Sequence, residues 1–223
     1  MSIFKKVEAV FFDWDGTLVD TVMSGLAVMN NFLSYKGKEM IEKDSYVVSP
    51  SLSVRDAFLS LFSPEEYREA VQEFKLFLDQ QREVVVPFKK SSCLLEFLYK
   101  KGVPVGIVSN QYGDVLRRQV KKLKWQSYFS YVSGSGDWEQ DKPSALPLIQ
   151  TLKQVGISPG KYVLFVGDSL VDMMCAQNAG CTPVSVGTQA KTFDGNFVSF
   201  ENIAHFYAEI KKSIENNFLG ENK

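Results

Sequence analysis

The sequence predicts an α/β protein with a doubly wound, five-stranded parallel sheet and an inserted helical cap domain. Short apolar runs alternate with helical patterns from residue 89 onward, which is typical of parallel βαβ units. One further apolar run comes first, and residues 20–88 after it carry helical patterns without a clear strand. We therefore expect a Rossmann-like core formed by residues 1–19 and 89–223, with a cap formed by residues 20–88.

The strands of the core are predicted from apolar runs bounded by turn residues. The run at residues 7–12 indicates a strand buried on both faces, as in parallel sheets. Right-handed crossovers place this strand in the centre and give the strand order 3-2-1-4-5. The five expected strands span residues 7–12, 103–109, 128–133, 162–166 and 183–186, and the expected core helices span residues 92–101, 114–123, 143–155, 170–179 and 202–214.

The cap is predicted to be helical throughout. Residues 18–33 carry an apolar stripe at helical spacing, and residues 53–62 repeat that pattern. Ser63, followed by Pro64 and by Glu66 three positions on, is a helix start of capping-box type. We expect this last cap helix to run to about Arg82.

Composition excludes several classes of protein. The chain has 223 residues, of which 45% are hydrophobic, so it suits one large domain or a core with a smaller one. The net charge of −1 gives no indication of nucleic acid or an acidic membrane as partner. We expect no signal peptide and no membrane span, because no apolar run is long enough. The three cysteines lack metal-type spacing and cannot all pair, which favours a reducing cytoplasm.

The most informative stretch is Asp13-Trp14-Asp15-Gly16-Thr17, directly after the first strand. In parallel α/β sheets, ligands bind at the carboxyl ends of strands. Two carboxylates there could hold a metal, attack an electrophile or transfer protons. Asp15-Gly16 could instead be a simple turn. A calcium loop is excluded, because glycine falls at the fourth position from Asp13 rather than the sixth.

Two more polar segments follow strands and are expected to converge on the same edge if the first strand is central, and a third lies in a connection. Ser109-Asn110 follows the second strand, and Asp168, with Asp172 four residues on, follows the fourth. Lys142-Pro143 precedes the helix that leads to the fourth strand. Each has a simpler interpretation: Ser109 or Asp168 as a helix cap, Asp172 as a solvated side chain, and Lys142-Pro143 as a helix opening. Their joint order along one α/β chain favours a common site.

These motifs identify a resemblance to a known family. The sequence resembles the haloacid dehalogenase superfamily of phosphohydrolases, in particular its phosphoglycolate phosphatase-like branch with a small helical cap. The resemblance extends from about Val7 to Gly187. It departs from the branch where Ser144-Ala145 follows Pro143 and where Lys89 begins the return to the core, which weakens a substrate assignment. The matching motifs are Asp13 to Asp20, Val108-Ser109-Asn110, Lys142-Pro143, and Gly167 to Asp172 continuing to Ala179-Gly180.

The resemblance implies a metal site and two catalytic carboxylates. Asp13 would be the nucleophile, and Asp15 would be the general acid and then the general base. Asp13, the backbone carbonyl of Asp15, and Asp168 would hold Mg²⁺, which takes oxygen ligands. Asp172 would fix Lys142 or a water on the metal.

It also implies the groups that bind the substrate. Lys142 would neutralise a phosphoryl oxygen and orient Asp13. Ser109 and the backbone near Asn110 would hydrogen-bond other phosphoryl oxygens. Arg55 in the cap is a candidate for substrate contact, since a guanidinium suits a carboxylate or phosphate; its simpler interpretation is a solvated helix residue. His205 lies outside every motif, so no histidine chemistry is expected.

The expected function is hydrolysis of a small phosphate monoester, phosphoglycolate-like or a sugar phosphate, with Mg²⁺ as cofactor. A phosphomutase of the same family keeps Asp15 and stays an alternative, as does a catalytically silent phosphate-binding protein. A dehalogenase would lack Asp15, and a receiver-type signalling domain would lack the insert. The sequence does not indicate an oligomeric state.

Overall fold

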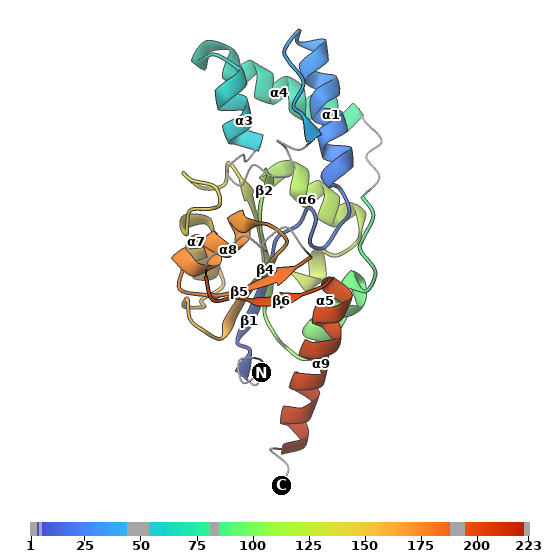
Figure 1. The fold of residues 1–223 in the computed structure, drawn as a ribbon, viewed down its shortest axis with the longest axis vertical. Helices are drawn as coiled ribbons and strands as arrows, with labels where there is room; N and C mark the ends of the chain where they lie inside the picture. The colour runs from blue at the N-terminus through green and yellow to red at the C-terminus, as the bar shows by residue number, and fades with distance from the viewer. Residues whose placement is uncertain (1–3, 5, 44–53, 81–84, 188–194, 221–223) are drawn as a thin grey trace.

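The computed structural model describes residues 4, 6–43, 54–80, 85–187 and 195–220. A parallel sheet lies between two layers of helices, and a further group of helices lies beyond the carboxyl ends of its strands (Figure 1). The predicted fold class, a doubly wound α/β sheet with additional helices, is confirmed.

The sheet has six strands in the order β3-β2-β1-β4-β5-β6, and every neighbouring pair is parallel. The expected order of the first five strands is confirmed, but the count of five is wrong. The sixth strand pairs with the fifth and has only three residues, too short for a periodic pattern to reveal. The strands are β1 (Ala9–Phe12), β2 (Val105–Tyr112), β3 (Tyr131–Ser135), β4 (Val163–Gly167), β5 (Thr182–Val186) and β6 (Val198–Phe200).

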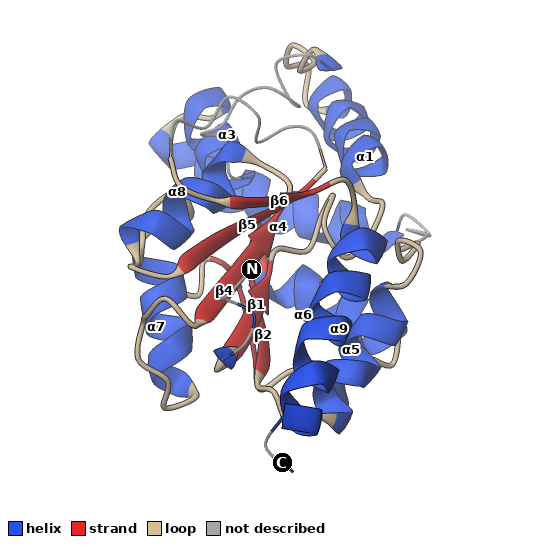
Figure 2. Ribbon diagram, turned by 60° about the horizontal axis from the view of Figure 1, so that its bottom comes forward, coloured by secondary structure: helices blue, strands red, loops and turns tan. Residues whose placement is uncertain are grey.

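Both faces of the sheet are covered, which explains why β1 is apolar at all four positions. Val10 and Phe12 belong to the cluster with α5, α6 and α9, whereas Ala9 and Phe11 belong to the cluster with α7 and α8. Figure 2 shows the sheet between these two helical layers. The helices are α5 (Ser91–Lys100), α6 (Gly113–Lys122) and α9 (Ile203–Gly220) on one side, with α7 (Leu146–Gln154) and α8 (Leu170–Asn178) on the other.

Two predicted boundaries differ where the chain approaches the carboxyl edge. The helix expected at residues 143–155 begins at Leu146, with Pro147 in its first turn, so Lys142-Pro143 lies in the preceding loop. The second strand continues past Ser109 to Tyr112, with an irregular register after Val108. Both differences arise at residues whose side chains or backbone contribute to the site described below.

The helical segment between β1 and β2 comprises α1 (Val22–Tyr35), α3 (Val54–Leu61) and α4 (Pro64–Gln80). The described part of residues 20–88 adds no strand to the main sheet. At Ser63, the expected capping box is present: its backbone N–H donates to Glu66 Oε2 at 2.9 Å, and its Oγ accepts from the Glu66 N–H at 3.3 Å. None of the described helices has the length and hydropathy that a membrane span requires.

The chain leaves and re-enters the core along two adjacent segments. The Asp20 N–H donates to the carbonyl of Val86 at 2.8 Å, and the Phe88 N–H donates to the carbonyl of Leu18 at 3.0 Å. Residues far apart in sequence are thereby joined at the base of the helical segment. The exact cap boundaries, and their action as paired hinges, stay predictions.

The helical segment has its own aromatic cluster. Phe58 on α3 is fully buried, with its ring centroid 5.0 Å from that of Phe74 and 5.1 Å from that of Phe62. The cluster continues to Tyr112 and Val115 of the core, so the two parts share one apolar contact region.

Replacing Phe58 tests how much this cluster stabilises the protein. We expect Phe58→Ala to lower the free energy of unfolding by about 3–5 kcal/mol, because it removes a buried ring and leaves a cavity. The control is Leu59→Ala on the same helix, where the side chain is 54% exposed and the change should stay within about 0.5 kcal/mol. Urea denaturation measures both, and similar losses for the two variants would contradict the packing argument.

Candidate active site

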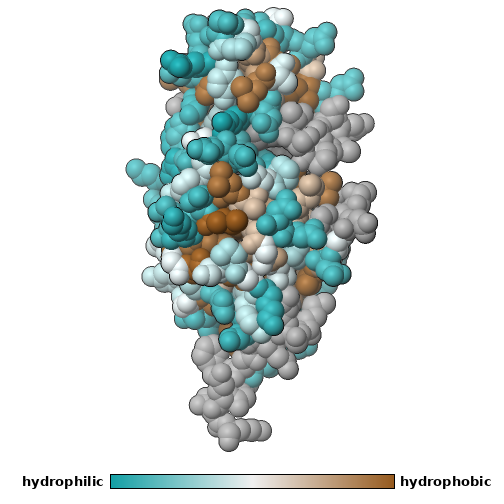
Figure 3. Space-filling view, turned by 90° about the vertical axis from the view of Figure 1, so that its left-hand side faces the viewer, coloured by the Kyte–Doolittle hydropathy of each residue, from teal (hydrophilic) through white to brown (hydrophobic). Residues whose placement is uncertain are grey.

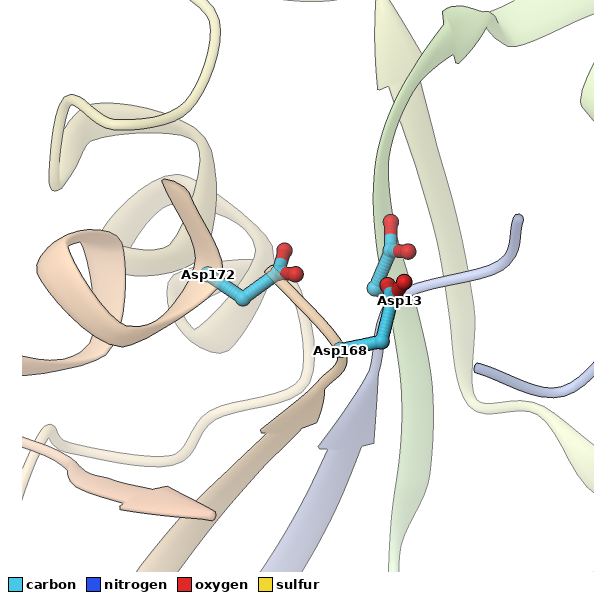
Figure 4. A group of neighbouring side chains, drawn as sticks. All are labelled: Asp13, Asp168 and Asp172. Carbon is cyan, nitrogen blue, oxygen red and sulfur yellow. The ribbon is translucent and has the colours of Figure 1, made fainter. Parts of the chain in front are cut away.

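Two buried carboxylates emerge side by side from neighbouring strands. Asp13 follows β1 and Asp168 follows β4, and these strands pair in parallel with Phe12 opposite Val166. The Asp13 N–H continues the ladder by donating to the Val166 carbonyl at 2.8 Å. Figure 4 shows the two carboxylates adjacent at the ends of the strands, with Asp172 directed toward them from α8. The predicted convergence at the carboxyl edge is therefore observed for these residues.

Lys142, in the loop between β3 and α7, binds two of the carboxylates. Its Nζ donates to Asp13 Oδ1 and to Asp172 Oδ1, both at 2.6 Å, and the side chain is only 3% exposed. The other oxygen of Asp172 accepts from the backbone N–H of Ser169 at 3.0 Å and from its hydroxyl at 2.5 Å. Because both of its oxygens are engaged, Asp172 holds the ammonium group in place beside Asp13.

The backbone of Lys142 is fixed by Asn110. The Asn110 side chain donates to the Lys142 carbonyl and accepts from the Lys142 N–H, both at 3.0 Å. Lys142 is joined to Pro143 by a cis peptide bond. Nearby, the buried hydroxyl of Ser109 accepts from the Gln111 N–H at 3.1 Å, which leaves its own proton able to donate to a ligand. Asn110 thus positions the lysine, a contact that the sequence motifs do not predict.

Asp15 begins a tight turn and also presents a half-buried carboxylate. The Gly16 N–H donates to the Val19 carbonyl at 2.9 Å, and the Leu18 N–H donates to the Trp14 carbonyl at 3.0 Å. The hydroxyl of Thr21 donates to the Asp15 carboxylate. The turn interpretation and the functional one are therefore compatible. Thr21 was missed because nothing in its local sequence indicates this contact.

Gly16 allows this turn to approach Asp168 closely. Its φ of +80° lies in the region that favours glycine, and a Cβ there would lie 2.4 Å from Asp168 Oδ2. The hydroxyl of Thr17 donates to the other oxygen, Asp168 Oδ1, at 3.3 Å. The turn after β1 and the carboxylate after β4 are thus in direct contact.

Burial and mutual repulsion shift the titration of the cluster. Burial raises the pKa of Asp13 to about 7, although Lys142 opposes the shift. Burial also raises the pKa of Asp168 well above its usual value, and the negative charges of Asp172 and Asp13 add to the effect. For Lys142, burial acts in the opposite direction, but Asp13 and Asp172 together raise its pKa. One ammonium group does not compensate all of the carboxylates.

The cluster suits a hard divalent cation. Asp13, Asp168 and Asp172 can each offer one oxygen, and these three oxygens lie within 4.8 Å of one another. Mg²⁺ prefers such oxygen ligands, and its charge would stabilise carboxylates whose pKa values are raised by burial and by their mutual repulsion. The sequence predicts that Asp172 lies outside the metal site. In the structure its two oxygens bind Lys142 and Ser169, and its role beside a metal stays a prediction.

Arg55, Trp14 and His205 have partners or positions outside the carboxylate cluster. Arg55 on α3 donates through Nη1 to the backbone carbonyls of Trp138 at 3.2 Å and Glu139 at 3.1 Å. Trp14 is fully buried, and its Nε1 donates to Gln119 Oε1 at 2.6 Å. His205 is exposed on α9.

The lysine and the buried carboxylates lie together at the switch point of a doubly wound sheet, which is where α/β enzymes bind their ligands. Residues 10–186 match the family described as haloacid dehalogenase-like hydrolase. The chain therefore belongs to this family, and the resemblance inferred from the motifs is confirmed.

Individual relatives are similar over nearly the same length. A phosphoglycolate phosphatase from Neisseria meningitidis is 29% identical over 82% of this chain and 81% of its own. One from Pseudomonas fluorescens is 30% identical over 80% of this chain and 69% of its own. A HAD-superfamily hydrolase structure from Ehrlichia chaffeensis is 28% identical, covers 93% of this chain and 98% of its own, and has a TM-score of 0.66.

A β-phosphoglucomutase structure from Clostridium difficile has a TM-score of 0.79 over 96% of this chain and 99% of its own. It is only 15% identical, so this likeness concerns the fold alone.

The contact between Gly16 and Asp168 can be tested by adding one methyl group. We expect Gly16→Ala to weaken Mg²⁺ binding, measured by calorimetry, because the new Cβ displaces the Asp168 carboxylate. The control is Gly156→Ala, which imposes a similar positive φ of +71° but has no heavy atom within 4 Å of the new Cβ. Equal Mg²⁺ affinity in the Gly16 variant and the wild type would contradict the close approach.

Proposed function

We propose that this protein is a Mg²⁺-dependent phosphatase that hydrolyses a small phosphate monoester through an aspartyl-phosphate. The observation that carries the proposal is the buried Asp13 carboxylate, 2.6 Å from Lys142 Nζ and grouped with Asp168. The names of its relatives, phosphoglycolate phosphatases, support a phosphoric monoester as substrate.

The metal would be held by Asp13, Asp168 and the backbone carbonyl of Asp15. When bound, Mg²⁺ would offset the negative charge that the phosphate and the carboxylates bring together. Asp172 contributes indirectly, since its oxygens already bind Lys142 and Ser169.

Asp13 would act as the nucleophile, and Asp15 would transfer protons. A carboxylate oxygen of Asp13 forms a bond to phosphorus while the ester P–O bond breaks, and the Asp15 carboxyl group gives its proton to the leaving oxygen. In the second step Asp15 takes a proton from water, whose oxygen attacks the phosphorus of the aspartyl-phosphate. Inorganic phosphate leaves and the Asp13 carboxylate is restored. The hydrogen bond from Thr21 fixes the orientation of Asp15 for both proton transfers.

Lys142 and Ser109 would bind the transferred phosphoryl group. The ammonium group of Lys142 orients Asp13 and neutralises a phosphoryl oxygen. The Ser109 hydroxyl and the backbone N–H of Asn110 would donate to the other oxygens. Asn110 acts further through its hydrogen bonds to the Lys142 backbone, which fix the lysine before substrate arrives.

A phosphomutase is the second candidate, because it would use the same aspartates and differ only in the acceptor of the phosphoryl group. The fold likeness to a β-phosphoglucomutase favours neither activity. Release of inorganic phosphate supports the phosphatase, whereas transfer between positions of a sugar phosphate supports the mutase.

A reducing compartment stays a prediction from the cysteines, all three of which are free thiols.

The proposed activity is tested with a panel of phosphate monoesters. We expect phosphate release from an aryl phosphate and from phosphoglycolate with Mg²⁺, and loss of that activity in the presence of a chelator. Restoration by added Mg²⁺ is the control that separates metal removal from unfolding. Equal rates with Mg²⁺ and with chelator would overturn the metal dependence, and no release from any monoester would overturn the phosphatase.

A matched pair of variants distinguishes the roles of Asp13 and Asp15. We expect Asp13→Asn to abolish turnover, because the nucleophile is removed. Asp15→Asn should lower turnover by about 10²–10⁴-fold, since only proton transfer is lost and an amide oxygen can still accept from Thr21. With an activated aryl phosphate, Asp15→Asn should accumulate a phosphorylated protein, because hydrolysis lacks its base.

Accumulation of the phosphorylated Asp15→Asn protein is measured by intact mass after rapid acid quench, as a gain of one phosphoryl group. If the Asp13→Asn variant also became phosphorylated, the nucleophile would have to be another residue. Failure of Asp15→Asn to accumulate label while the wild type turns over would contradict the assigned proton transfers.

A further inference from the structure

The loop that carries Lys142 is held at both ends by the core. It connects β3 to α7 and begins beside Asp137, whose carboxylate accepts from the Gly134 N–H at 2.8 Å and from Arg117 at 2.7 and 3.1 Å. At its far end, Asp141 accepts from the Ser135 hydroxyl at 2.8 Å, directly before Lys142. The middle of the loop, residues 138–140, contacts the core through Trp138, whose Nε1 donates to the Ser133 hydroxyl at 2.7 Å.

Arg55 binds this middle part from α3. Its Nη1 donates to two successive backbone carbonyls, those of Trp138 and Glu139, and the second of these lies three residues before Lys142. A charged donor makes a stronger hydrogen bond than a neutral one. The guanidinium therefore links a helix of the inserted segment to the backbone that leads directly to the buried ammonium group.

A second link between the two parts involves other elements. Lys75 on α4 forms an ion pair with Asp114 at the start of α6, with Nζ and Oδ2 3.0 Å apart, and its ammonium lies 4.8 Å from the Tyr112 ring centroid. This link joins the helical segment to α6 and does not involve residues 136–142. It provides a natural control for the Arg55 contact.

We propose that Arg55 is a positioning residue that fastens the helical segment to the Lys142 loop, so that docking of the segment and placement of Lys142 occur together. Arg55 then acts on the reaction through Lys142, which contacts Asp13 at 2.6 Å. The docked segment excludes water from a site in which charge interactions are thereby strengthened. The effect on catalysis rests on the proposed function, whereas the effect on the loop does not.

The first experiment measures hydrogen exchange in the substrate-free protein, comparing Arg55→Ala with Lys75→Met. The key amide is that of Lys142, whose N–H is bound by Asn110 Oδ1. In fragments covering residues 136–145, we expect Arg55→Ala to speed exchange about tenfold, since a hydrogen bond to a charged donor is worth at least that factor in an opening equilibrium. Lys75→Met should leave those fragments unchanged. Unchanged exchange in Arg55→Ala, or an equal increase in both variants, would overturn the proposal.

The second experiment separates positioning from direct substrate contact. Phosphoglycolate carries a carboxylate remote from the phosphate, and phenyl phosphate does not. We expect Arg55→Ala to lower kcat/KM by the same factor, about tenfold, for both substrates. A loss confined to phosphoglycolate would assign Arg55 to the substrate carboxylate and overturn the positioning role. If the wild type hydrolyses neither ester, the proposed function fails, and the exchange experiment still decides whether Arg55 fastens the loop.

Discussion

The structure depends on burying several carboxylates around one ammonium group at the carboxyl edge of the sheet. Lys142 lies between Asp13 and Asp172, and Asp168 adds a further negative charge beside them. Burying unpaired charge is costly, so each member must be held by hydrogen bonds or by an opposite charge. Burial raises the pKa values of Asp13 and Asp168, and the neighbouring negative charges add to the shift. A divalent cation would offset this burden of buried negative charge.

The parallel sheet makes this concentration of charge possible. Adjacent parallel strands end at the same edge, so β1 and β4 deliver Asp13 and Asp168 side by side. Glycine then allows the close approach of the next segments. A Cβ at Gly167, the last residue of β4, would lie 2.3 Å from the Cβ of Asp172, so the first turn of α8 can lie directly over the strand end. Gly16 has the same relation to Asp168. The positions of the charges are thus set by backbone geometry before any ligand binds.

The inserted helices are joined to this edge by apolar and polar contacts. The aromatic cluster around Phe58 includes Tyr112, the last residue of the strand that carries Ser109 and Asn110, and Val115 on the helix that follows it. Lys75 and Arg55 add polar links to α6 and to the loop before Lys142. The inserted segment is therefore attached to the same elements that form the site. A change in the position of the inserted helices would therefore be transmitted to the residues at this edge of the sheet.

The sequence by itself determined the fold class, the order of the first five strands and the residues at the strand ends. These follow from local periodicity, and strand-end motifs in a parallel sheet must converge. Only the tertiary structure decided the sixth strand, β6, which pairs with β5 at the edge of the sheet and is too short to show a pattern. It also decided the partners of Thr21, Asn110 and Arg55. Arg55 binds carbonyls 83 and 84 residues away, and Asn110 binds the backbone of a residue 32 positions away. Backbone carbonyls are present at every residue, so no local sequence signal distinguishes the ones that a distant side chain will bind.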